Sequence, residues 1–211
     1  MVKEKIAIIG AGGFGREVFS LLNKDLFDIV GFIDNHADHE IALPAPIIGD
    51  DDILPLLKSL GLAVGVCITI GNMARRKKIF DKAIAAGLSL PKIIHSSTSI
   101  LTSVPLGDGV IIYPGVIVMS DCYIGKGVLL NSGVTIGHDV VIGDFSNINP
   151  GVHLAGKITI GEHTMIGIGA CVRENIRIGN RVVVGAGSVV VNDIPDDCVV
   201  YGVPAKIQKV K

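Results

Sequence analysis

The sequence contains no tryptophan, few aromatic residues (4%) and only four cysteines. These cysteines, Cys67, Cys122, Cys171 and Cys198, stand far apart and form no CxxC pair. This spacing argues against a disulfide framework or a structural zinc site and favours reduced thiols. An excess of one charge is also missing, because 19 basic and 20 acidic residues leave a formal net charge of −1. We therefore expect neither nucleic acid nor an anionic membrane as a partner.

The N-terminus lacks a long apolar run. Three of the first five residues are charged, and the apolar run at 6–9 is far too short for the core of a signal peptide or for a membrane span. We expect a cytoplasmic protein without a metal cofactor. A chain of 211 residues is long enough for two modest domains.

What the sequence does contain is Ile, Leu or Val at every sixth position from Ile94 to Val190, without a gap. The residue four places after each of these is small or β-branched, from Thr98 and Val104 through to Ile194. Such a period takes precedence over other signals, because internal repeats organise the whole fold. The two sets of side chains can share one narrow interior.

Short strands that turn every six residues, three to a turn, build a triangular parallel β-helix with about 18 residues per coil. Gly follows the aliphatic residue in eight repeats and Asn follows it in two, and both tolerate the backbone of a tight corner. We expect this all-β domain over residues 93–195, followed by a C-terminal cap or tail over 196–211.

The N-terminal third begins with a strand, a glycine turn and a helix. A β-rich apolar run at residues 5–9 precedes the motif GAGGFG at 10–15, in which Gly12 lets the backbone approach a phosphate. A second strand over 28–34 ends in Asp34, 19 residues after the last glycine, where a partner for a ribose hydroxyl belongs. The pattern predicts a nucleotide-like ligand.

Alternating strands and helices over residues 1–92 predict a small parallel sheet, whose ligands bind beyond the carboxyl ends of the strands. Gly71 should therefore lie at the same edge as Gly12 and Asp34. The basic cluster at 75–78 could reach a pyrophosphate, but a basic helix face is more often solvated, and we favour that interpretation. The sheet amounts to one mononucleotide-binding half, which disfavours a nicotinamide oxidoreductase. The further expected elements are a helix at 50–60, a strand at 64–70, a helix at 72–86 and a strand at 92–94.

This combination resembles the bacterial family of hexapeptide-repeat sugar acyltransferases of the NeuD/PglD type, which includes sialic acid O-acetyltransferases and nucleotide-amino-sugar N-acetyltransferases. The resemblance implies a Rossmann-like α/β half domain followed by a left-handed parallel β-helix, a homotrimer, and acetyl-CoA as acyl donor. The motifs that carry it are GAGGFG at 10–15, FIDN at 32–35, IGN at 70–72, NSGVTIGHD at 131–139 and GVPAK at 202–206.

His138 is the best candidate for a general base. It stands one residue after a glycine corner and directly before Asp139, whose charge would favour the imidazolium formed during acyl transfer. A lone histidine on a β-helix is more often a surface residue. The resemblance favours the functional interpretation, because a histidine followed by an acidic residue serves as the base in that family.

The resemblance also implies the binding contacts. Gly156, with its N–H as an oxyanion donor, stands 18 residues after His138 and should stack one coil beyond it. Relatives often have histidine at the positions of Phe14 and Asn147, which here differ. The implied coenzyme contacts are Asn147, Gly156, Ile168 and Ala186. The implied sugar-nucleotide contacts are Gly12, Gly13, Phe14, Asp34, Asn35 and Gly71, with Asn131 near the acceptor group.

The sequence has no serine or cysteine nucleophile with a paired base, so direct attack without an acyl-enzyme is expected. The favoured function is acetyl-CoA-dependent N-acetylation of a nucleotide-linked 4-amino-4,6-dideoxy sugar for bacterial surface glycans. One alternative is O-acetylation of sialic acid or a related sugar. Another is a non-enzymatic binding protein built on the same repeat.

Overall fold

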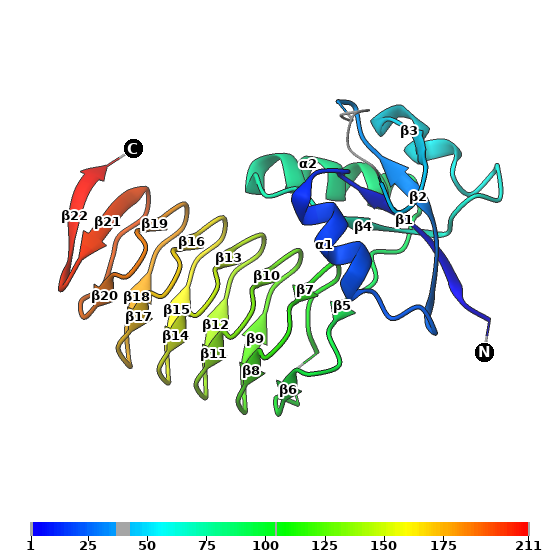
Figure 1. Ribbon diagram of the computed structural model, residues 1–211. Helices are drawn as coiled ribbons and strands as arrows, with labels where there is room; N and C mark the ends of the chain where they lie inside the picture. The colour runs from blue at the N-terminus through cyan, green and yellow to red at the C-terminus, as the bar shows by residue number, and fades with distance from the viewer. Residues whose placement is uncertain (1, 37–42, 104, 211) are drawn as a thin grey trace. The chain divides into compact units, whose positions relative to one another are not determined.

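The computed structural model describes residues 2–36, 43–103 and 105–210. The chain divides into two compact units, Met1–Ile93 and Ile94–Lys211. The first unit alternates strands and helices, and the second is a stack of short strands (Figure 1).

The first unit is a parallel four-stranded sheet with strand order β3-β2-β1-β4. Its strands are apolar where the sheet is covered: Ile6, Ile8 and Ile9 of β1 are at most 1% exposed. A parallel sheet places the ends of β1, β2 and β4 at one edge, where ligands bind. The elements are β1 (Glu4–Ile9), α1 (Gly13–Leu21), β2 (Phe27–Ile33), β3 (Ile47–Gly49), the 3₁₀ helix η1 (Asp51–Leu56), β4 (Gly65–Ile68) and α2 (Met73–Ala85).

Two details of the first unit differ from the sequence-based expectation. The segment expected as a helix over 50–60 forms only the short 3₁₀ helix η1, which contains Pro55. Proline has no N–H to donate and disfavours the helical conformation of the residue before it, so a longer α-helix is interrupted there. The strand β3 was also not predicted, and its three residues directly follow Pro46.

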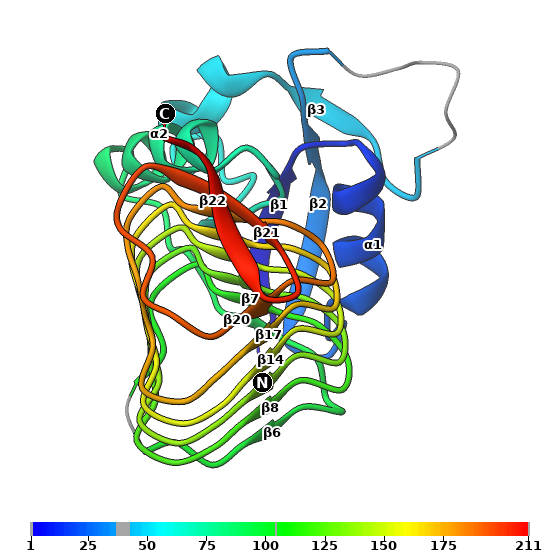
Figure 2. The ribbon, with the colours of Figure 1, turned by 90° about the vertical axis from the view of Figure 1, so that its left-hand side faces the viewer.

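The second unit is the parallel β-helix that the six-residue period predicts. Its strands form three faces: face 1 follows the order β5-β7-β10-β13-β16-β19-β21-β22, face 2 follows β6-β8-β11-β14-β17-β20, and face 3 follows β9-β12-β15-β18. Figure 2 looks along the stack, so that successive coils overlap. The family implied by the resemblance has a left-handed β-helix, and the strand pattern agrees with it.

Nearly every strand of the stack has two residues, which matches the spacing of the repeat. They are β5 (Ile93–Ile94), β6 (Ser99–Ile100), β7 (Ile111–Ile112), β8 (Ile117–Val118), β9 (Tyr123–Ile124), β10 (Leu129–Leu130), β11 (Thr135–Ile136), β12 (Val141–Ile142), β13 (Asn147–Ile148), β14 (His153–Leu154), β15 (Thr159–Ile160), β16 (Met165–Ile166), β17 (Cys171–Val172), β18 (Arg177–Ile178), β19 (Val183–Val184), β20 (Val189–Val190), β21 (Cys198–Gly202) and β22 (Ala205–Val210).

The interior of the stack contains the two periodic sets of side chains. From Ile112 to Val190 every aliphatic position is buried, because the second residue of each two-residue strand points inward. The first positions depart from this rule: Ile94 is 38% exposed, and Leu106 is half-buried and lies outside any strand. Val104, expected in the interior, lies outside the described residues. At the other end, β21 and β22 pair antiparallel and form a hairpin on the last coil.

Candidate active site

His138 lies at a corner between face 2 and face 3. Ile136, the last residue of β11, is buried, and Gly137 then starts the turn. Asp139 adopts a positive φ of 58°, and its N–H donates to the carbonyl of Ser120 at 3.1 Å. This corner directs the His138 side chain away from the interior. We call the line of corners that stacks Ser120, His138 and Gly156 the His138 edge.

His138 and Asp139 form a hydrogen-bonded pair at this edge. The Nδ1 of His138 lies 2.7 Å from the Oδ2 of Asp139, and both side chains are half exposed. A carboxylate only accepts hydrogen bonds, so Nδ1 carries the proton and Nε2 carries the lone pair of the neutral ring. The pair therefore presents an oriented imidazole nitrogen that can accept a proton.

Gly156 lies directly against the imidazole ring, as the 18-residue coil predicts. A Cβ added at Gly156 would lie 2.6 Å from Nε2 and 2.8 Å from Cε1 of His138. The coils are joined here by the N–H of Lys157, which donates to the carbonyl of His138 at 2.8 Å. The ring occupies the space that any side chain at position 156 would need.

The backbone N–H of Gly156 has no hydrogen-bond acceptor among the described residues. It lies beside a ring nitrogen that can take a proton. An unused N–H in that position can stabilise negative charge that develops on a carbonyl oxygen near Nε2. The corner thus combines a nitrogen that can accept a proton, a carboxylate that orients the ring and an N–H that can donate to an oxyanion.

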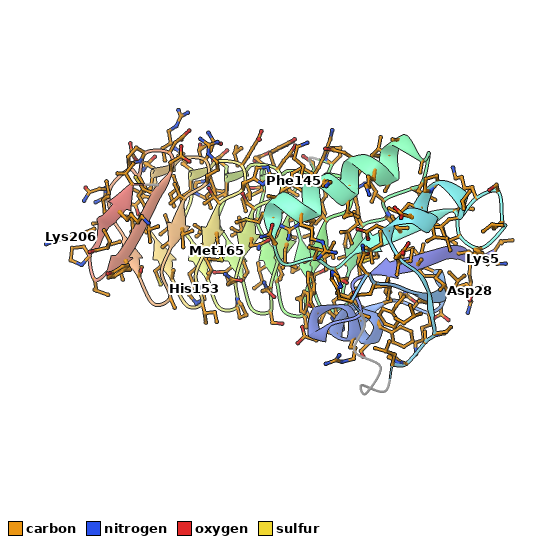
Figure 3. The ribbon with its side chains drawn as sticks, turned by 90° about the horizontal axis from the view of Figure 1, so that it is seen from above. Lys5, Asp28, Phe145, His153, Met165 and Lys206 are labelled. Atoms are coloured by element: carbon orange, nitrogen blue, oxygen red, sulfur yellow. The ribbon has the colours of Figure 1, made fainter. Side chains whose placement is uncertain are left out.

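The other described histidines have different surroundings. His153 projects outward from β14 (Figure 3), and its Nδ1 lies 2.7 Å from the hydroxyl of Thr135. His163 stacks on Phe145 with ring centroids 5.5 Å apart. The Nδ1 of His95 lies 2.8 Å from the Ser97 hydroxyl. In the described part of the chain, only His138 combines a carboxylate partner with a glycine beneath its ring.

The other β-helix residues that the family resemblance implies as ligand contacts lie elsewhere on the three-faced stack. Asn131, Ile168 and Ala186 occupy turns between face 1 and face 2, which we call the Asn131 edge. Ile168 is 60% exposed there, and its carbonyl accepts the N–H of Gly187 at 2.7 Å. Asn147 lies on face 1 in β13 and is 6% exposed. One chain therefore brings together His138, Asp139 and Gly156, but it holds the other predicted coenzyme contacts on a different edge and face.

The glycine turn of the first unit is fixed by close backbone contacts. A Cβ at Gly15 would lie 1.9 Å from the carbonyl oxygen of Gly10, so α1 can approach the turn only with glycine there. The carboxylate of Asp34 accepts the Ala11 N–H at 2.7 Å through Oδ2 and the His36 N–H at 2.8 Å through Oδ1. Asp34 thus ties the end of β2 to the turn.

A cavity of about 200 Å³ opens at this end of the sheet. Gly12, Asp34 and Asn35 line it, whereas Gly13, Phe14 and Gly71 are not among its lining residues. A Cβ added at Gly12, Gly13 or Gly71 would meet no atom of the described residues within 4 Å, apart from the chain neighbours. The described residues therefore leave open space at all three glycines. The lining residues are Ile9, Gly10, Gly12, Ile33, Asp34, Asn35, Asp51, Thr69, Ile70 and Arg75.

The interpretation of residues 75–78 as a solvated helix face was wrong for Arg76, which is buried, whereas Arg75 is exposed and also lines the cavity. Arg75 lies in the first turn of α2, where its backbone N–H donates to the capping side chain of Asn72 at 2.9 Å. Arg76 is 2% exposed and donates to the Ile70 carbonyl at 2.8 Å. Burial lowers the pKa of its guanidinium to about 10. The sequence feature that could have placed Arg75 at the cavity is its position in the first turn of the helix that follows β4.

The described residues show neither a metal-binding cluster nor a membrane-spanning helix. No three His, Cys, Asp or Glu side chains of the described residues form a group that could hold a metal ion. Within the same residues, no helix is long and apolar enough to cross a membrane.

Comparisons with known proteins agree with both halves of the chain. Residues 5–83 match the PglD N-terminal domain, and residues 104–138, 121–156 and 157–192 match the bacterial transferase hexapeptide (six repeats). Among curated proteins, no match is found.

Solved structures match nearly the whole chain. The acetyltransferase domain of PglB from Neisseria gonorrhoeae FA1090, in complex with acetyl coenzyme A, is 33% identical, with a TM-score of 0.88 over 98% of this chain and 100% of that one. The chain belongs to the NeuD/PglD type of hexapeptide-repeat sugar acetyltransferases. PerB from Caulobacter crescentus, in complex with CoA and GDP-perosamine, is 36% identical, with a TM-score of 0.90 over 97% of both chains. WeeI from Acinetobacter baumannii AYE is 30% identical, with a TM-score of 0.82 over 96% of this chain and 98% of that one.

Membership of this sugar acetyltransferase family confirms the fold and the class of enzyme that the sequence predicted. The protein is an acyltransferase with an α/β N-terminal unit and a hexapeptide-repeat β-helix.

Proposed function

We propose that this enzyme transfers the acetyl group of acetyl-CoA to the amino group of a nucleotide-linked 4-amino-4,6-dideoxy sugar for bacterial surface glycans. The observation that carries the proposal is the arrangement of His138, Asp139 and Gly156 at one corner. Relatives bound to acetyl coenzyme A and to CoA with GDP-perosamine support the choice of donor and acceptor.

In the proposed reaction, donor and acceptor bind together. The sugar amine attacks the thioester carbonyl carbon, and Nε2 of His138 takes the proton that the amine loses. The carbonyl oxygen becomes an oxyanion and accepts the N–H of Gly156. Collapse of the tetrahedral intermediate breaks the carbon–sulfur bond, and the coenzyme thiolate leaves and takes up a proton. Asp139 keeps Nε2 aimed at the amine and stabilises the imidazolium.

We propose that the nucleotide occupies the cavity of the first unit. Gly12, Gly13, Phe14, Asp34, Asn35 and Gly71 are its proposed contacts, and Asn131 lies near the acceptor group. The open space that the described residues leave around a Cβ at Gly12, Gly13 and Gly71 supports this, because it suits a ligand.

We also propose a homotrimer in which the coenzyme binds along two subunits. The proposed coenzyme contacts Asn147, Gly156, Ile168 and Ala186 lie on two edges and one face of the prism. A neighbouring subunit can place its Asn131 edge beside the His138 edge and so complete the site. Light scattering of the purified protein tests this, and a stable active monomer would contradict it.

The function is tested by thiol release from acetyl-CoA with a panel of 4-amino nucleotide sugars and with free sialic acid. We expect acceptor-dependent release with an amino nucleotide sugar, and turnover roughly two to four orders of magnitude lower in His138→Ala. His153→Ala is the matched control, because this histidine is also exposed but lies on face 2, and it should keep its turnover. Near-normal rates in His138→Ala would remove this residue from the mechanism, and activity only with sialic acid would contradict the amine acceptor.

A further inference from the structure

The polar side chains around the cavity of the first unit come from three separate segments. Asp34 and Asn35 follow β2, Asp51 begins η1, and Arg75 lies in the first turn of α2. If a nucleotide binds here, as the proposed function holds, these groups face its base, ribose and phosphates. Their donors and acceptors then determine which base fits.

Asn35 presents a hydrogen-bond donor to the cavity. Its Oδ1 accepts the backbone N–H of Asp51 at 3.2 Å. Because the partner is a donor, the amide oxygen must face it, and the Nδ2 group is left with no acceptor among the described residues. The same bond attaches the start of η1 to the end of β2 and so fixes the position of Asp51.

Asp51 presents the only lining carboxylate that remains without hydrogen bonds inside the described chain. Both oxygens of Asp34 already accept backbone N–H groups, whereas no described group donates to the side chain of Asp51. Its backbone is held by the cap of η1, where Asp50 accepts the Asp52 N–H at 3.0 Å. A carboxylate on a fixed backbone and an amide donor therefore line the same cavity and are available to a ligand.

A carboxylate accepts hydrogen bonds and cannot donate them when ionised. Guanine carries two adjacent donors, N1–H and the N2 amino group, next to the acceptor O6. Uracil and thymine carry one imide N–H between two carbonyl oxygens, which a carboxylate would repel. Adenine and cytosine carry an acceptor nitrogen beside their amino group. Only guanine offers two neighbouring donors to a carboxylate and one acceptor to an amide.

We propose that Asp51 selects a guanine nucleotide, with its carboxylate accepting from N1–H and N2–H and the Asn35 amide donating to O6. Arg75 is the one cationic side chain that lines the cavity among the described residues, and it pairs with the diphosphate. The acceptor is then a guanosine diphosphate sugar. We place Asp51 at the base and not at the diphosphate, because the negative charges of a carboxylate and a phosphate repel each other.

The test is the affinity of the full-length protein for GDP, UDP and dTDP, measured by calorimetry without acetyl-CoA. The wild-type protein should bind GDP at least about tenfold more tightly than UDP. Guanine donates two hydrogen bonds to the Asp51 carboxylate, whereas uracil can donate only one. Asp51→Asn should lower the ratio of GDP to UDP affinity by about tenfold or more. Using the ratio removes the general effect of one lost negative charge on phosphate binding.

Asp52→Asn is the matched control, because it makes the same charge change one residue away, in a side chain that does not line this cavity. It should leave the ratio unchanged. Equal affinity for the three nucleotides, or the same ratio in Asp51→Asn as in Asp52→Asn, would overturn the selection of guanine and leave the proposed acetyl transfer standing. Failure of all three nucleotides to bind would instead contradict the nucleotide-linked acceptor itself.

Discussion

The contact between Gly156 and His138 predicts a large kinetic effect from one methyl group. In Gly156→Ala the new Cβ would lie 2.6 Å from Nε2 and 2.8 Å from Cε1, closer than carbon approaches these atoms in real structures. The imidazole is half exposed, so it can rotate into solvent. The backbone N–H of residue 156 is kept. The substitution should therefore move the base and leave the oxyanion donor and the fold intact.

Displacing a reacting group by about 1 Å costs roughly a hundredfold in rate, and full loss of a general base costs about 10² to 10⁴. We expect kcat of Gly156→Ala to fall by roughly a hundredfold or more, with a melting temperature close to that of the wild type. The assay is steady-state thiol release with saturating donor and acceptor, together with thermal unfolding. Glu174→Ala, at the equivalent corner one coil further and exposed, should change neither value.

A double-mutant cycle makes this prediction specific. If the methyl group acts by displacing the base, adding Gly156→Ala to His138→Ala should have little further effect. Equal fold-losses in both backgrounds would show that Gly156 acts independently of His138. Wild-type turnover in the single variant would refute the reasoning from the contact.

Three further predictions concern Asp139, Cys171 and Cys67. Asp139→Asn keeps a residue type that tolerates a positive φ but loses the carboxylate, so kcat should fall by roughly ten- to a hundredfold at unchanged melting temperature, and an unchanged kcat would contradict its role. Of the four thiols, Cys171 is exposed and the others are buried, so Ellman's reagent should label one thiol of the native protein, and this labelling should vanish in Cys171→Ser. Burial raises the pKa of Cys67 to about 12 from an ordinary value of 9.0. Above pH 9 the unfolded chain therefore binds fewer protons at this thiol than the folded one, and the free energy of unfolding should decrease as pH rises toward 12. Urea unfolding of Cys67→Ala should show a smaller decrease, and equal slopes would contradict the assignment.

The β-helix could be predicted because one periodic pattern in the sequence specifies both the short strands and the packing of side chains between coils. Each aliphatic residue from Ile112 onward is buried by the coil above and the coil below, so the period itself specifies the interior. Ile94 breaks the pattern because it stands at the end of the stack, where one side has no complete coil to cover it. The period also places Gly156 beside His138 without any knowledge of coordinates.

The features that escaped prediction depend on single residues and on contacts between distant segments. Pro55 reduced an expected helix to a short 3₁₀ turn, and β3 has only three residues, too few for a periodic signal. The position of Arg75 at the cavity requires knowledge of where β4 ends and α2 begins. The protonated nitrogen of His138 follows only from the 2.7 Å contact with Asp139.

The most direct test of the account is the product formed from acetyl-CoA and a GDP-linked 4-amino-4,6-dideoxy sugar, followed by mass spectrometry and NMR. The account predicts one acetyl group on the sugar nitrogen, formed by the wild-type enzyme and lost by roughly two to four orders of magnitude in rate in His138→Ala. Acetylation at a hydroxyl oxygen, or no acetylated product from any amino nucleotide sugar, would contradict it.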